Sequence, residues 1–202
     1  AIDSMQREIG LPARGEDKVR LWVGNGMDRL VKRALTDHIN GEPEAALLEH
    51  AYPLFLEAYA ARPCVSSRFY PDVEIFLEHL KNGGYKIGCI TNKTARITDQ
   101  LLRLLGIYDN FDIILSGDSL ANRKPDPLPL LYAGEQLRVT TDKMLMIGDS
   151  QTDVDAARAA GIDIVCVSYG YNRGRDIRTA EPDRVVDSLT ELLADLPPAA
   201  AA

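Results

Sequence analysis

Two aspartates stand four positions apart just after an apolar run in the second half of the chain. The run KMLMIG ends at Gly148 and is followed by Asp149-Ser150-Gln151-Thr152-Asp153. Carboxylates at such a strand-to-helix turn can hold a hard cation such as Mg²⁺, one directly and the other through water. The alternative is helix capping, with Ser150 as the N-cap and Asp153 in the first turn.

A second polar cluster, Thr91-Asn92-Lys93, ends the apolar run KIGCIT. A hydroxyl beside the backbone N–H groups of a helix N-terminus can cradle a phosphate. A threonine that only caps the following helix has the same pattern, so both interpretations stay open.

A third cluster is Arg123-Lys124-Pro125-Asp126-Pro127. Its two prolines restrict the backbone, so Lys124 is predicted to be a fixed cation that neutralises phosphate beside the carboxylates. A solvated loop is the alternative. A fourth cluster, residues 169–174, either walls the site or only turns the chain.

The elements that must position these clusters alternate along the chain from about residue 86 onward. Near-continuous apolar runs predict parallel strands at 86–91, 111–116, 143–149 and 163–169. Helical patterns separate them at 94–106, 128–139 and 152–161. This alternation predicts an α/β fold with a doubly wound parallel sheet, whose strand ends form the usual ligand-binding edge.

The beginning of the chain has a different pattern. Helical patterns cover 1–9, 16–22, 27–39 and 43–61, and no convincing strand occurs there. We therefore expect a small helical domain over 1–68, an α/β core over 69–196 and a disordered tail over 197–202.

The order of the clusters resembles motifs two, three and four of the haloacid dehalogenase superfamily. The resemblance assigns phosphate binding to Thr91 and Asn92, positioning of phosphate and nucleophile to Lys124, and Mg²⁺ binding to Asp149 supported by Asp153. Residues 19–35 and the segments 169–174 and 182–193 resemble phosphoglycolate phosphatases, whose small helical cap follows the first motif. The cap glycines Gly24 and Gly26 either present backbone to the substrate or link two helices.

The superfamily's first motif, Asp-x-Asp-Gly-Thr, is absent from the 202 residues. Its first aspartate attacks phosphorus and its second is the general acid and base. Positioning groups cannot replace a covalent nucleophile. We therefore expect the nucleophile upstream of residue 1, on a strand that the α/β core lacks, and the chain alone to be inactive.

Composition limits the possible partners. The net charge of −7 argues against nucleic acid or anionic lipid as the main partner, and the apolar runs are too short to span a membrane. Cys89 and Cys166 lie in strand-like runs without CxxC spacing, which indicates reduced thiols and a cytoplasmic setting.

The resemblance implies a Mg²⁺-dependent phosphatase that acts on a small phosphorylated metabolite, 2-phosphoglycolate above all. Two alternatives stay open. One is another capped enzyme of the superfamily, such as a sugar-phosphate mutase or a dehalogenase, and the other is a catalytically dead phosphate-binding module.

Overall fold

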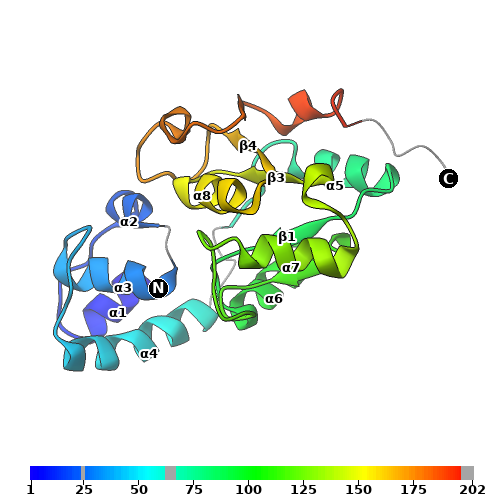
Figure 1. Cartoon of the computed structure of the whole chain (residues 1–202). Coiled ribbons are helices and arrows are strands. Elements are labelled where there is room, and N and C mark those ends of the chain that lie inside the picture. The colour runs from blue at the N-terminus through cyan, green and yellow to red at the C-terminus, as the bar shows by residue number, and fades with distance from the viewer. Residues whose placement is uncertain (24–25, 62–66, 197–202) are drawn as a thin grey trace.

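The computed structural model describes residues 1–23, 26–61 and 67–196. A group of helices lies on one side of the molecule and an α/β part on the other (Figure 1). The predicted tail at 197–202 lies outside the described residues. The predicted fold class is confirmed, since parallel strands alternate with helices through the second part of the chain.

The helical part contains the four predicted helices, which pack around one apolar cluster. Met5, Val31 and Ala34 are completely buried there, and Phe55 is almost so. These residues recur at helical spacing, which gives each helix one apolar face for its neighbours. The helices are α1 (Ile2–Glu8), α2 (Glu16–Trp22), α3 (Met27–Thr36) and α4 (Ala45–Ala61).

The α/β part contains five short parallel strands. Four of them match the predicted runs but are shorter, and the fifth was not predicted. The strands are β1 (Gly88–Ile90), β2 (Ile113–Leu115), β3 (Leu145–Gly148), β4 (Asp163–Val167) and β5 (Arg184–Val186). The helices around them are α5 (Val73–Asn82), α6 (Ala95–Leu104), α7 (Leu128–Leu137) and α8 (Gln151–Ala160).

Among the described residues the strands form two separate sheets. β1 pairs only with β2, whereas β4 pairs with β3 on one side and β5 on the other. β1 and β3 therefore each have one side without a strand partner among the described residues. Gly88 of β1 is exposed and Leu145 of β3 is 40% exposed.

The first helix of the α/β part packs against the end of the described chain. The cluster that buries Phe76 of α5 includes Val186 of β5 and Leu189 and Leu192 of the 3-10 helix η4 (Leu189–Leu192). His79 Nε2 donates to the carbonyl oxygen of Leu196 at 2.7 Å. Segments far apart in the sequence therefore stabilise each other.

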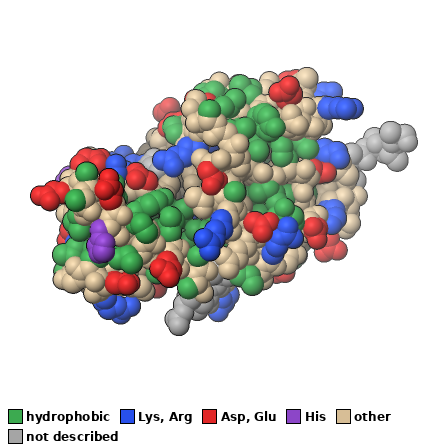
Figure 2. Space-filling model, turned by 90° about the horizontal axis from the view of Figure 1, so that it is seen from below, with side chains coloured by type: hydrophobic (Ala, Val, Ile, Leu, Met, Phe, Trp, Pro, Cys, Tyr) green, Lys and Arg blue, Asp and Glu red, His purple; other side chains and the backbone are tan. Residues whose placement is uncertain are grey.

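No helix in the described part of the chain is long and apolar enough to cross a membrane. On the face shown in Figure 2, basic and acidic side chains are interspersed, and neither sign gathers into a continuous band. This face therefore offers no basic surface that would suit a nucleic acid backbone.

Candidate active site

Lys124 joins the two sheets at their carboxyl ends. Its ammonium donates to the carbonyl oxygen of Ile90, the last residue of β1, at 2.5 Å. It also donates to Oδ1 of Asp153 in α8 at 2.8 Å. Only 8% of Lys124 and 5% of Asp153 is exposed. The interpretation of Lys124 as part of a solvated loop is therefore wrong.

Asp153 both caps α8 and pairs with Lys124. Its Oδ2 accepts hydrogen bonds from the backbone N–H of Asp149 and from N–H and Oγ of Ser150. Burial alone would raise the pKa of Asp153, but the Lys124 ammonium and these hydrogen bonds hold it below its ordinary value. Asp153 is therefore an ionised carboxylate that is already compensated by protein groups.

Asp149 lies in a different electrostatic environment. Its Oδ2 accepts the backbone N–H of Tyr171 at 2.8 Å, and no other N–H or O–H donor in the described chain reaches the carboxylate. Burial and the nearby charge of Asp153 raise the pKa of Asp149 above its ordinary value. A cation beside this carboxylate would offset both effects.

The residues fit a divalent cation that keeps most of its ligands outside the protein. In the described ranges, no three His, Cys, Asp or Glu side chains lie together as a metal site. Asp149 is the one carboxylate of the pair that lacks a cationic partner, since Lys124 already pairs with Asp153. One carboxylate plus waters and a substrate phosphate is an arrangement that Mg²⁺ commonly adopts.

Thr91 and Asn92 follow β1 and lie beside the Lys124 loop. Helix α6 begins at Ala95 with Thr94 as its N-cap, so the alternative in which Thr91 caps the helix is wrong. Thr91 Oγ1 accepts the backbone N–H of Lys93 at 3.2 Å, which leaves its own proton available. Asn92 Nδ2 donates to the carbonyl oxygen of Lys124 at 2.7 Å, while its buried Oδ1 has no hydrogen-bond partner.

Two glycines of the helical domain, Gly24 and Gly26, were predicted to contact the substrate. Gly24 lies outside the described residues. Gly26 is the N-cap of α3 with φ +88°, and a Cβ added there would lie 2.8 Å from Nη1 of Arg123. The helical domain therefore meets the core next to Lys124.

The loop at 169–174 lies against Asp149. A Cβ on Gly170 would overlap the side chain of Asp149, so only glycine fits this close approach. Asn172 Oδ1 accepts the N–H of Gln151, the first residue of α8, at 3.1 Å. No local pattern in the sequence predicts the contacts of Tyr171 and Gly170 with Asp149, because both depend on tertiary folding.

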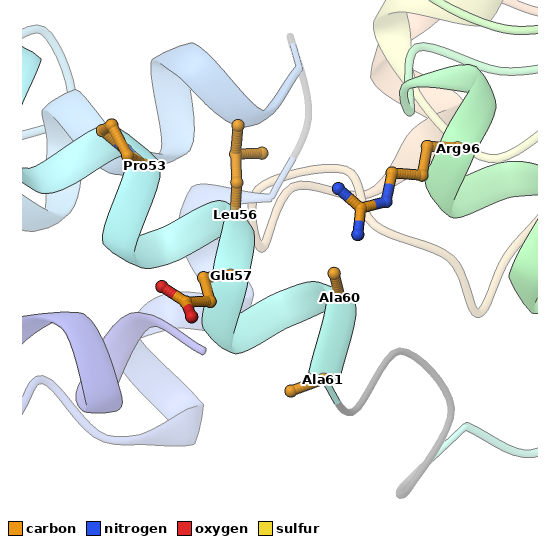
Figure 3. Close-up of a pocket in the computed structure, with 6 residues that line it drawn as sticks. All are labelled: Pro53, Leu56, Glu57, Ala60, Ala61 and Arg96. Atoms are coloured by element: carbon orange, nitrogen blue, oxygen red, sulfur yellow. The ribbon is translucent and has the colours of Figure 1, made fainter.

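A separate hollow of about 470 Å³ lies between α4 and α6. Figure 3 shows Arg96 of α6 extending toward Leu56 of α4, while Glu57 points away from it. None of the predicted site residues lines this hollow. The lining residues are Pro53, Leu56, Glu57, Ala60, Ala61 and Arg96.

A comparison with known protein families shows which family the chain belongs to. The family described as haloacid dehalogenase-like hydrolase matches residues 6–167. The chain belongs to the haloacid dehalogenase-like hydrolase family. The resemblance inferred from the motif order is thereby confirmed.

Relatives within the haloacid dehalogenase-like hydrolases cover nearly all of the chain. It is 53% identical to a phosphoglycolate phosphatase of Nitrosococcus oceani, over 94% of this chain and 84% of the relative. It is 44% identical to one of Thiobacillus denitrificans, over 95% and 84%. The crystal structure of "a predicted phosphoglycolate phosphatase" from Haemophilus somnus aligns with TM-score 0.89 and 33% identity, over 96% of this chain and 88% of that one.

Proposed function

We propose that this chain provides the substrate- and metal-binding part of a phosphatase that converts 2-phosphoglycolate to glycolate and phosphate. The observation that carries the proposal is the buried Lys124–Asp153 pair, which brings the end of β1 and the Asp149 turn together. The substrate is inferred from the names of the relatives.

The chain's own residues would bind and orient the phosphate. A lysine ammonium has three donors, and Lys124 uses two of them on Ile90 and Asp153. The third would be directed at a phosphate oxygen. Thr91 would donate its hydroxyl proton to a second oxygen, since this hydroxyl accepts from Lys93 within the protein. Asn92 would hold the Lys124 loop in register with β1 through its side-chain amide.

Asp149 would hold Mg²⁺, and Asp153 would support it indirectly through Lys124, Ser150 and water. When bound, the metal would offset the negative charge of the phosphate. The contrast between the compensated Asp153 and the uncompensated Asp149 supports this division of roles.

The nucleophile would be contributed by a β-strand that carries Asp-x-Asp-Gly-Thr and lies between β1 and β3. The edges of β1 and β3 that such a strand would join are unpaired in the described chain, and Lys124 connects their ends. The orphaned Oδ1 of Asn92 also needs a donor, which a strand N–H could supply. The first aspartate would attack phosphorus and break the ester P–O bond, forming an aspartyl-phosphate, while glycolate leaves with a proton from the second aspartate. Water, deprotonated by the second aspartate, would then hydrolyse the aspartyl-phosphate and release phosphate.

The helical domain would cover the bound substrate. Contact between Gly26 and Arg123 brings its α3 N-terminus to the Lys124 loop, so Gly26, together with Gly24, would border the non-phosphate end of the substrate. The free thiols of Cys89 and Cys166 agree with the proposed cytoplasmic setting.

The test is an extended chain, in which about 25–30 residues carrying a strand and Asp-x-Asp-Gly-Thr precede residue 1. Phosphate release is measured from 2-phosphoglycolate and from sugar phosphates, with Mg²⁺ or with EDTA. We expect Mg²⁺-dependent release that is fastest from 2-phosphoglycolate. The control carries asparagine at the first aspartate of the added motif and should be inactive. Preference for a sugar phosphate would favour the mutase-like alternative, and phosphate binding without turnover would favour the non-catalytic module.

Asp149→Asn in the extended chain should reduce Mg²⁺-dependent turnover at least about 100-fold, because Asp149, unlike Asp153, lacks a cationic partner and would lose its charge. Asp155→Asn is the matched control, since this exposed aspartate lies on α8 and bonds only Gln151. Near-normal turnover of Asp149→Asn at ordinary Mg²⁺ would refute the metal assignment.

A further inference from the structure

Two consecutive residues of the loop after β4 contact Asp149, and the next one contacts the start of α8. Gly170 packs against the Asp149 side chain, Tyr171 donates its N–H to Asp149 Oδ2, and Asn172 accepts the first N–H of α8. The loop therefore determines which carboxylate oxygen of Asp149 faces away from the protein.

The same loop contacts helix α2 of the helical domain. The guanidinium carbon of Arg20 lies 4.8 Å from the centroid of the Tyr171 ring, within the range of a cation–π interaction. One residue further along α2, the Leu21 side chain lies 3.0 Å from where a Cβ on Gly174 would be. In Figure 1, α2 lies directly below this loop.

Tyr171 also faces the segment that enters the core from the helical domain. The Tyr70 and Tyr169 rings lie 4.7 Å apart at an angle of 41°. Burial raises the pKa of Tyr171, and the nearby Tyr70 adds to this increase. One side of the loop thus faces the core, while Arg20 contacts it from the side of the helical domain.

We propose that Arg20 and Tyr171 are positioning residues through which the helical domain, when it covers the site, fixes the carboxylate of Asp149. Arg20 holds the Tyr171 ring, and the Tyr171 backbone holds Asp149 Oδ2, so Oδ1 is left to face a ligand. The role of Asp149 in this inference rests on the proposed function, whereas the contact between the loop and α2 does not.

The test is amide hydrogen exchange at Tyr171, measured by NMR on the full 202-residue chain. Arg20→Ala should speed exchange about two- to fivefold, since an exposed cation–π contact contributes about that factor. Arg20→Lys should restore slow exchange because it keeps the cation. Lys18→Ala is the control: this exposed lysine on α2 pairs with Asp37 and does not contact the loop. The chain's single tryptophan, Trp22, reports through its emission that α2 stays folded in the two Arg20 variants.

Exchange at Tyr171 that is unchanged in Arg20→Ala would overturn the proposal, as would a failure of Arg20→Lys to restore it. Calorimetric titration with MgCl₂ then tests the link to Asp149, and Arg20→Ala should bind Mg²⁺ about two- to fivefold more weakly. Faster Tyr171 exchange with unchanged Mg²⁺ affinity would overturn that link. If the unaltered chain binds no Mg²⁺, the metal assignment in the proposed function fails, and Tyr171 exchange still decides whether Arg20 holds the loop.

Discussion

The two sheets of the α/β part differ in how completely their strands are paired. In the three-stranded sheet, β4 has neighbours on both sides, and its Ile164 and Cys166 are fully buried. In the two-stranded sheet, β1 has only β2, and its Gly88 is exposed. Strand pairing alone does not decide burial, however, since Val186 of β5 is only 1% exposed although β5 pairs with β4 alone.

The chemistry is divided between the same two sheets. Thr91 and Asn92 follow the two-stranded sheet, whereas Asp149 and Asp153 follow the three-stranded one. Lys124 contacts both through Ile90 and Asp153. The site is thus assembled across the unpaired edges of β1 and β3. Changes to either sheet, or to the Lys124 connection between them, should therefore have different effects.

The largest expected effect comes from pairing the open edges. Adding the first-motif strand to make the extended chain should raise the free energy of unfolding by about 3–8 kcal/mol, since several hydrogen bonds of about 1 kcal/mol each would form on both edges. Such a gain is large beside a typical domain stability of about 5–15 kcal/mol. Urea denaturation of the two chains measures it. Equal midpoints and slopes would mean that no strand fits between β1 and β3.

Removing the connection between the sheets should have the next largest effect. Lys124→Ala leaves the buried Asp153 carboxylate without its cation, and breaking such a pair costs about 3–5 kcal/mol. In the extended chain turnover should also fall at least about 100-fold. Lys93→Ala is the control, two residues beyond Thr91. Adding Asp153→Asn to Lys124→Ala should recover part of the stability, and a purely additive double variant would argue against the pair.

A substitution in the loop that follows β4 of the three-stranded sheet should have a smaller effect on stability. Gly170→Ala forces Asp149 or the loop to move, and overpacking of this kind costs about 1–3 kcal/mol. We also expect Mg²⁺ affinity to fall about tenfold, as measured by calorimetry. Gly106→Ala is the matched control, because Gly106 has φ +72° and open space around it. It should lower stability alone, so equal losses of Mg²⁺ affinity in both variants would contradict the assignment.

The smallest effect is expected from a hydrogen bond that occurs in both sheets. In each sheet, an aspartate carboxylate accepts a backbone N–H near the amino end of a strand. Asp112 Oδ2 accepts the N–H of Ile87 at 2.8 Å, and Asp183 Oδ2 accepts the N–H of Ile164 at 2.7 Å. For both carboxylates the backbone hydrogen bond is the main cause of a lowered pKa. Asp112→Asn and Asp183→Asn should each cost about 1 kcal/mol or less at pH 7.

The pH dependence of that cost has a defined sign. A carboxylate with a lowered pKa in the folded state stabilises the protein at pH values above its unfolded pKa of about 3.9. This stabilisation is lost as the pH falls through the lower folded value. Thermal unfolding from pH 7 to pH 3 should therefore bring each variant closer to the unaltered chain below about pH 4. A difference that widens with acid would contradict this explanation.

The sequence predicted much of this arrangement but not all of it. Uniform apolar runs and helical periodicity gave four strands and most helices, and the motif order gave Thr91, Lys124 and the aspartates as neighbours. β5 was missed because only Arg184, Val185 and Val186 form it, which is too short to show a pattern. The Arg20–Tyr171 and Gly170–Asp149 contacts were missed because no local spacing encodes a meeting of distant segments.

The packing of α5 against the end of the described chain also affects synthesis on the ribosome. His79 and its partner Leu196 are 117 residues apart. At translation rates of about 5–20 residues per second, α5 emerges roughly 6–23 s before its partner segment. During that interval the apolar face around Phe76 lacks Val186, Leu189 and Leu192, which bury it in the folded chain. This apolar face therefore stays uncovered until β5 and η4 have been synthesised, and slower translation between α5 and β5 would prolong its exposure.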